Sequence, residues 1–307
     1  MQQGTRMKEQ EMKLGGPFIE DDDEYHAHTK EKRTIASTAL KVFRGSPADY
    51  EARFILNIDK QTESPAMYFG KAAHCLILEG PEAFDHRFKL LDEQTAEEIG
   101  VINKKTGKPY GQDTAAFKKG MAGFKEKFGG RQPILPDEYE MLVSMQKSVA
   151  ENEVANDLLN IRNGMPEAVF RYFSESLDIT LQCKADRLLL NEDGTKIRGF
   201  VDLKTCQCLH EFKRKARIFQ YPQQMCFYRE TIERVCKAEQ STLELDAMDV
   251  FLVAVEKRVP FKVGVWAFPT LVLDELGDDL TEELCRYSAC LKTNNWPTGF
   301  EGVQEWE

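Results

Sequence analysis

Residues 179–205 constrain the fold of this chain most strongly. They consist of a long apolar run, a turn signal and a second apolar run. The turn signal is Asn191-Glu-Asp-Gly194, and both Asn and Asp-Gly tolerate the positive φ angles that tight turns require. A shorter run of the same kind precedes them at 169–173. The pattern therefore predicts three consecutive strands, at 169–173, 179–190 and 197–205, joined as a β-meander.

The segments on either side of these strands follow other periods. Apolar residues at helical spacing precede the meander, and a helical stretch, two strands and a final helix follow it. The expected elements are helices beginning near 35 and 46, at 66–79, near 81, at 113–128, at 136–151 and at 209–237, strands at 249–256 and 261–267, and a helix at 270–293. Residues 92–112 are polar and irregular and predict a loop. This order indicates an α+β, or mixed α/β, fold.

Three charged residues of the predicted hairpin come together when its strands fold back. A turn centred on the Asp-Gly pair sets Asp186 opposite residue 200 or 202. Because side chains alternate with a period of two, Asp186, Asp202 and Lys204 then share one face. Two carboxylates and a lysine are costly to bury without a purpose. A hard divalent cation bound by the carboxylates, with the lysine beside a reacting water or phosphate, supplies such a purpose.

The alternative interpretation of this strand is a solvated face. An isolated Asp-x-Lys pair more often forms an incidental ion pair, because charged side chains are mostly exposed. Here Phe200, Val201 and Leu203 make the strand apolar, and Gly199 allows another backbone to approach closely. The spacing to Asp186 is a second, independent coincidence. These features favour a functional site.

Length and composition set the organisation of the chain. The 307 residues could form one large domain or two. A polar, Gly-containing segment with the acidic run Glu20-Asp-Asp-Asp-Glu24 predicts a disordered leader over 1–33, followed by one folded domain over 34–300 and a tail over 301–307. No segment approaches the ~20 apolar residues that span a bilayer, and the N-terminus lacks an apolar signal region. We therefore expect a cytoplasmic protein without a membrane partner.

The cysteines do not form a recognisable framework. Eight are spread over the chain, and the one close pair, Cys206-Gln-Cys208, lacks the Cys-x-x-Cys spacing of zinc sites. We expect reduced, mostly buried thiols, with a metal at Cys206 and Cys208 as the less favoured alternative.

The charge pattern bears on a nucleic-acid partner. A net charge of −10 at first argues against one. Two basic clusters weaken the argument from net charge. Residues 101–133 hold eight Lys or Arg, and Lys213, Arg214 and Arg217 follow the third strand. Such clusters suit an enzyme that grips a polyanion locally, and a solvated Lys-rich helix face explains them equally well.

Four further polar residues are candidates for the same site. His74 would present a neutral imidazole nitrogen to a metal, although a lone histidine on an apolar helix is more often a core residue. Gln224 and Tyr228 stand at i and i+4 of one helix and could donate to phosphate oxygens. Alternatively they form the polar edge of that helix. Glu167 opens the first strand and could lie near a metal, without a geometric argument for it.

Several motifs occur along the chain in a characteristic order. They are Ser46-Pro-Ala-Asp-Tyr, Phe69-Gly-Lys-Ala-Ala-His74, Leu78-Glu-Gly-Pro-Glu-Ala-Phe, Ala185-Asp186-Arg187, Gly199-Phe-Val-Asp-Leu-Lys-Thr205, Gln224-Met-Cys-Phe-Tyr228 and Asn295-Trp-Pro297. As a set, from about Thr34 to Pro297, they resemble the exodeoxyribonuclease VIII (RecE-like) nuclease domain of the PD-(D/E)XK superfamily. The resemblance implies a nuclease core with a central mixed β-sheet flanked by helices and an N-terminal helical region.

The resemblance also implies an activity. The family degrades one strand of linear double-stranded DNA 5′ to 3′, with Mg²⁺, and leaves 3′ overhangs for phage or prophage recombination. It works on DNA ends beside a single-strand annealing recombination protein, often as a ring-shaped homo-oligomer. The cysteine spacing here does not fit the four-cysteine pattern of related nucleases, so no iron–sulfur cluster is expected.

By motif match, the resemblance implies roles for individual residues. His74, Asp186, Asp202 and the backbone carbonyl of Leu203 would bind the metal, and Lys204 would orient or activate the attacking water. Gln224 and Tyr228 would hold the substrate strand. Because His74 makes the ligand set softer, Mn²⁺ should substitute for Mg²⁺.

Two departures leave rival hypotheses open. Asp202 stands where the superfamily more commonly has Glu, although the RecE-like branch accepts Asp, and the chain is acidic for a protein that threads DNA. One rival is another enzyme of the superfamily, an endonuclease or a spacer-processing nuclease. The other is a catalytically silent DNA-binding module, against which the joint presence of His74, Asp186, Asp202 and Lys204 argues.

Overall fold

A computed structural model describes residues 12–29, 31, 33–59, 64–103, 106, 110–111, 114–159 and 164–303. The start of the expected leader, residues 1–11, and most of the expected tail, residues 304–307, lie outside the described residues. Within the described part, no helix is both long and apolar enough to cross a membrane.

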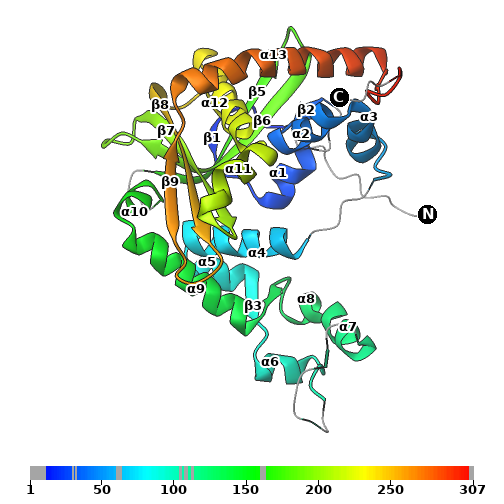
Figure 1. Ribbon diagram of the computed structural model, residues 1–307, viewed down its shortest axis with the longest axis vertical. Coiled ribbons are helices and arrows are strands. Elements are labelled where there is room, and N and C mark those ends of the chain that lie inside the picture. Colours follow the sequence, from blue (N-terminus) through cyan, green and yellow to red (C-terminus); the bar gives the residue numbers. More distant parts are fainter. Residues whose placement is uncertain are drawn as a thin grey trace, which may run out of the picture.

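A seven-stranded mixed sheet forms the centre of the molecule (Figure 1). Its strands are β1 (Gly15–Phe18), β2 (Thr34–Ile35), β5 (Met165–Ser174), β6 (Ile179–Leu190), β7 (Lys196–Cys206), β8 (Glu244–Glu256) and β9 (Val263–Ala267). The order is β1-β5-β6-β7-β8-β9, with β2 parallel to β6. The antiparallel meander β5-β6-β7 is as predicted, and β8 joins it in parallel to β7.

Helices cover both faces of this sheet, which confirms the predicted mixed α/β class (Figure 1). One face carries α2 (Ser37–Gly45), α12 (Tyr221–Lys237) and α13 (Thr270–Thr293), around a core that includes Phe43, Phe200 and Met225. The other face carries α4 (Pro65–His74), its π-helical continuation η2 (Cys75–Glu79), α5 (Pro81–Arg87), α9 (Pro136–Glu151) and α10 (Glu153–Leu159). Shorter elements are α1 (Asp22–His28), α3 (Pro47–Tyr50), η1 (Glu51–Ile55), η3 (Leu209–Glu211) and α11 (Phe212–Ile218).

The predicted hairpin turn between β6 and β7 lies where expected. Gly194 has φ +73°, and its N–H donates to the Asn191 carbonyl at 3.0 Å. Gly199, expected to allow a close backbone approach, lies against Asp249 of β8. A Cβ atom at this position would sit 1.9 Å from the Asp249 carbonyl oxygen. The parallel β7–β8 pairing therefore requires glycine here.

The predicted loop over 92–112 contains a helix instead. Asp92 starts α6 (Glu93–Glu98) by accepting a hydrogen bond from the Thr95 N–H at 2.8 Å. With α7 (Ala115–Ala122), α8 (Phe124–Lys127), β3 (Phe88–Leu90) and β4 (Gln132–Ile134), it forms a small lobe that projects away from the sheet (Figure 1). A separate small core that includes Val101 and Phe124 stabilises this lobe.

The expectation of a disordered leader over 1–33 is wrong for residues 12–29. β1 pairs with β5, and Tyr25 of α1 packs against Phe18 and Val169. The acidic composition suggested disorder because it offers few apolar side chains for burial. Contacts with residues far along the chain order the segment instead.

A buried ion pair fastens this segment to the sheet. The side chain of Arg171 on β5 is fully buried, and its guanidinium donates to both carboxylate oxygens of Glu20. Its Nε donates to the Gln182 side chain at 2.8 Å. Such a pair is costly to break, because removing one member leaves a buried charge without a partner.

We expect Arg171→Met to lower the free energy of unfolding by about 3–5 kcal/mol. The double variant Arg171→Met/Glu20→Met should recover much of this loss, because replacing both members of a buried pair by apolar residues is often neutral. Urea unfolding followed by circular dichroism measures both. An Arg171→Met protein as stable as the wild type would show that the ion pair does not hold the segment.

Candidate active site

Strands β6 and β7 stop pairing partway along the sheet and separate, and we call this point of separation the fork. Their last pair joins Arg187 to Val201, and Asp186 and Asp202 are the next residues on the two strands. Beyond this pair β7 continues beside β8, whereas β6 keeps β5 as its neighbour. Asp186 Oδ2 accepts a hydrogen bond from the Leu203 N–H at 2.7 Å, in place of a further ladder bond. The two predicted carboxylates therefore meet at the fork of the sheet.

Asp202 is the centre of a connected polar group beneath α12. It is 1% exposed, and its Oδ2 lies 2.5 Å from Lys204 Nζ. The Gln224 amide donates to Asp202 Oδ1 at 3.3 Å and to the Tyr228 hydroxyl at 3.0 Å. Lys204 Nζ also lies 5.1 Å from the centroid of the Tyr221 ring. The structure thus brings the predicted lysine, amide and phenol together around one carboxylate.

His74 and Glu167 approach Asp186 from two other elements. His74 Nδ1 at the end of α4 lies 3.5 Å from Asp186 Oδ2. Glu167 of β5 completes a group in which one ligand atom from each of the three side chains lies within 4.8 Å of the others. Glu167 has φ +50°, a conformation that non-glycine residues rarely adopt and that is often found at functional sites. The structure therefore supplies the geometric argument for Glu167 that the sequence lacked.

Burial dominates the electrostatics of the fork. It raises the pKa of Asp186 to about 7, with the charge of Glu167 adding to the rise and Lys204 opposing it. Burial also raises the pKa of Asp202 to about 6, although Lys204 again acts against it. Burial alone would lower the pKa of Lys204, but the two aspartates outweigh it and raise that pKa. Burial, followed by Lys204, lowers the pKa of His74. A bound cation would relieve the crowding of negative charge.

The donor set fits a divalent cation. Carboxylate oxygens are the ligands that Mg²⁺ prefers, and a neutral imidazole also suits Mn²⁺. Asp202 Oδ2 is buried and lies 2.5 Å from Lys204 Nζ, so a cation bound at this oxygen would share it with the lysine. The backbone of Leu203, predicted to provide a carbonyl ligand, lies close enough to His74 to act on the pKa of that imidazole in the raising direction. These groups could hold a divalent metal.

The predicted basic residues lie beside this group and not in it. Lys213, Arg214 and Arg217 are exposed on α11. Phe212 of the same helix packs against Tyr221, with ring centroids 6.2 Å apart. Because Tyr221 contacts Lys204, the basic helix adjoins the fork.

Sequence reasoning missed two charged residues at the fork. Lys184 Nζ lies 2.8 Å from Glu167 Oε2 and also pairs with Asp22 of α1. Lys184 precedes Asp186 by two positions on β6, so the period of two could have indicated it. Asp22 carries no such signal, because it belongs to the acidic run that predicted disorder.

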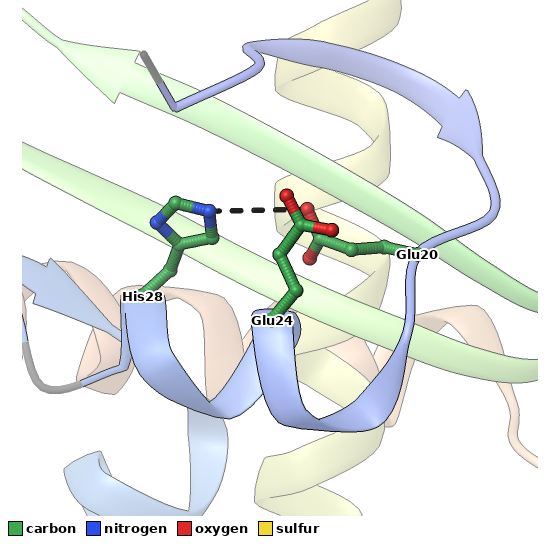
Figure 2. Close-up of side chains that lie close together, drawn as sticks. All are labelled: Glu20, Glu24 and His28. Carbon is green, nitrogen blue, oxygen red and sulfur yellow. Dashed lines mark ion pairs between the residues drawn. The ribbon is translucent and has the colours of Figure 1, made fainter. Parts of the chain in front are cut away.

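A second group of metal-binding residue types, Glu20, Glu24 and His28, lies at α1 (Figure 2). Glu24 and His28 stand one turn apart on the helix, and Glu20 precedes it. Both oxygens of Glu20 already accept from Arg171, and His28 Nδ1 lies 2.6 Å from Glu31 Oε1. Glu20 thus already has the buried Arg171 as its partner, and the three residues help to hold α1 against the sheet.

Comparisons with known proteins place this architecture in a family. No curated protein matches the chain. The crystal structure of a candidate exonuclease from Eubacterium rectale is similar over 94% of this chain and 96% of that chain, with a TM-score of 0.55 and 13% identity, which shows a shared fold. The structure of SSO0001 aligns with 85% of this chain and 81% of that chain at 12% identity, and its TM-score of 0.32 is too low to indicate the same fold.

A model described as a PDDEXK-like domain of unknown function (DUF3799) matches residues 36–305. Because this match spans most of the chain and agrees with the mixed sheet between two helical layers, the protein belongs to the PDDEXK-like family DUF3799.

Proposed function

We propose that this protein is a metal-dependent nuclease that hydrolyses phosphodiester bonds from the ends of linear double-stranded DNA. Membership of a PDDEXK-like family supports a nuclease. The observation that carries the proposal is the fork, where Asp186 and Asp202 converge with Lys204 beside His74. A buried and a largely buried carboxylate, a cationic donor and an imidazole in one place suit phosphodiester hydrolysis.

The residues of the fork have distinct roles in this proposal. His74, Asp186, Asp202 and the Leu203 carbonyl, with Glu167 beside them, would hold Mg²⁺ or Mn²⁺. When bound, such a cation supplies an activated water and neutralises charge on the phosphate.

Lys204, fixed by Asp202, donates to a phosphate oxygen or orients the attacking water. The Gln224 amide keeps Asp202 in place through its hydrogen bond. Tyr228 is 8% exposed and accepts from Gln224, so its contribution to holding the substrate strand runs through that amide.

A path for the DNA strand adjoins the fork. Gln224 lines a hollow of about 110 Å³ together with Lys41 and Phe219. Phe219 is 46% exposed, and Lys41 Nζ lies 5.5 Å from the centroid of its ring. An exposed aromatic ring beside a lysine suits a base and a phosphate of one strand. Lys213, Arg214 and Arg217 on α11 would extend this path.

The proposal extends to the biological setting that the motif resemblance implies. The polarity is 5′ to 3′, and the product is a duplex with 3′ single-stranded overhangs for phage-type recombination. The partners are double-stranded DNA ends, a single-strand annealing protein and further copies of this chain in a ring. The setting is the bacterial cytoplasm.

A time course with Mg²⁺ on linear duplexes labelled at the 5′ or the 3′ ends tests the proposal, with a closed circular duplex as control. We expect stepwise loss of one strand of the linear DNA, release of the 5′ label first, and an intact circle. Cleavage of the circle would instead indicate an endonuclease. Binding of DNA without metal-stimulated cleavage would indicate the silent binding module.

A further inference from the structure

We propose that Lys184 and Asp22 are positioning residues for the metal site: they fix Glu167 in the orientation in which its carboxylate binds the cation. This inference rests on the proposed function, because it concerns the same site. It also assigns a role to α1, which connects the N-terminal segment to the fork.

The contacts of Lys184 hold its ammonium group from several sides. Its side chain is 14% exposed, and Nζ lies 2.8 Å from Glu167 Oε2. Nζ also pairs with Asp22 Oδ1 and lies 5.3 Å from the centroid of the Tyr25 ring. An ammonium held by two carboxylates and an aromatic ring has little freedom to move.

This arrangement constrains the carboxylate of Glu167. Lys184 engages one of its two oxygens, and the backbone of Glu167 is held at φ +50°. The carboxyl group still lies within 4.8 Å of the ligand atoms of His74 and Asp186. One oxygen can therefore stay with Lys184 while the other faces a cation. Partners of this kind orient metal ligands, and their loss typically weakens metal binding 10–100-fold.

The charges along this chain of contacts also match a divalent cation. Between Asp22 and Lys204 lie four carboxylates (Asp22, Glu167, Asp186 and Asp202) and two lysines, with Glu167 and Asp186 next to each other. A dication would offset the excess of negative charge and favour the ionised forms of Asp186 and Asp202. Without Lys184, Glu167 would face Asp186 with no positive partner of its own.

Asp22 links this function to the folded N-terminal segment. It is the first residue of α1, which is fastened by the Arg171–Glu20 pair and by Tyr25. The position of Lys184 therefore depends on the segment that composition alone would assign to a leader.

The test measures Mn²⁺ binding to the DNA-free protein by calorimetry, so that its readout is separate from cleavage. We expect Lys184→Met to bind Mn²⁺ about 10–100-fold more weakly. Lys184→Arg, which keeps a cationic donor, should stay within about threefold of the wild type, and Asp22→Asn should fall between the two. Lys196→Met is the matched control, because Lys196 pairs with the exposed Glu244 at 3.1 Å on the same sheet.

The outcomes separate this inference from the proposed function. Unchanged or tighter Mn²⁺ binding by Lys184→Met and Asp22→Asn would overturn it, since the lysine would then be a mere structural ion pair or a competitor of the metal. If Lys184→Met does not fold, equal affinities of Asp22→Asn and the wild type would overturn it as well. Weakened Mn²⁺ binding in a protein whose wild type cuts no DNA would support the positioning role and refute the nuclease.

Discussion

Asp202→Asn should abolish phosphodiester hydrolysis without disturbing the fold. Asn matches Asp in shape and can still accept the Gln224 hydrogen bond at Oδ1. It replaces Oδ2, the oxygen that lies 2.5 Å from Lys204 Nζ, by an amide nitrogen that cannot bind a cation. Metal ligation supplies several kcal/mol of transition-state stabilisation, so we expect a rate at least about 10³-fold lower. Initial rates on a 5′-phosphorylated linear duplex measure this loss, together with weaker Mn²⁺ binding.

A lower rate could also result from unfolding, so the stability of the variant is measured separately. The pKa of Asp202 predicts how that stability depends on pH. Burial raises this pKa to about 6 in the folded protein, whereas an aspartate in an unfolded chain titrates near about 3.9. The folded state therefore favours the protonated form, and ionisation costs stability as the pH rises from about 4 to about 6. Asn cannot ionise. In EDTA the wild type should therefore lose stability relative to the variant as the pH rises from about 4 to about 6, on top of the cost of leaving Lys204 without its carboxylate partner in the variant.

Asp246→Asn is the matched substitution, because Asp246 is exposed on β8 and lies outside the fork. It should leave both the rate and Mn²⁺ binding unchanged. Hydrolysis by Asp202→Asn within tenfold of the wild-type rate would remove Asp202 from the catalytic site.

Much of the fold and of the site could be predicted because it depends on local patterns. The period of two and the turn at Asn191–Gly194 indicate β6 and β7, and the same hairpin brings Asp186 beside Asp202. Pro222 in the first turn of α12 marks the helix that carries Gln224. Side-chain periodicity then places Asp202 and Lys204 on one side of β7, as the distance of 2.5 Å between them shows.

The parts that could not be predicted depend on contacts between distant residues. Glu20 lies 151 positions before Arg171, and Asp22 lies 162 positions before Lys184. No local pattern reveals such pairs, so an acidic segment with few apolar residues resembles a disordered one. Glu167 could be named only as a candidate without a geometric argument, because its place beside Asp186 depends on the pairing of β5 with β6.

Lys204→Met should slow hydrolysis about 10²–10⁴-fold while the metal still binds. Met fills similar space over the Tyr221 ring but cannot donate to a phosphate oxygen or to water. Lys204 is not a metal ligand, and its charge opposes that of a cation at Asp186 and Asp202. Mn²⁺ affinity at about pH 8 should therefore stay equal or increase, in contrast to Asp202→Asn.

Parallel measurements of Mn²⁺ binding and of initial rate decide between roles for Lys204. Lys204→Arg, which keeps the positive charge but does not deprotonate, distinguishes charge from proton transfer. Partial activity in this variant would indicate that Lys204 acts through its charge, and activity as low as that of Lys204→Met would indicate proton transfer or exact placement of the water. Lys204→Met could instead lose Mn²⁺ affinity to the same extent as it loses rate. Lys204 would then serve to hold Asp202 in the geometry of a ligand, and the fork would have no separate group for the chemistry of the attacking water.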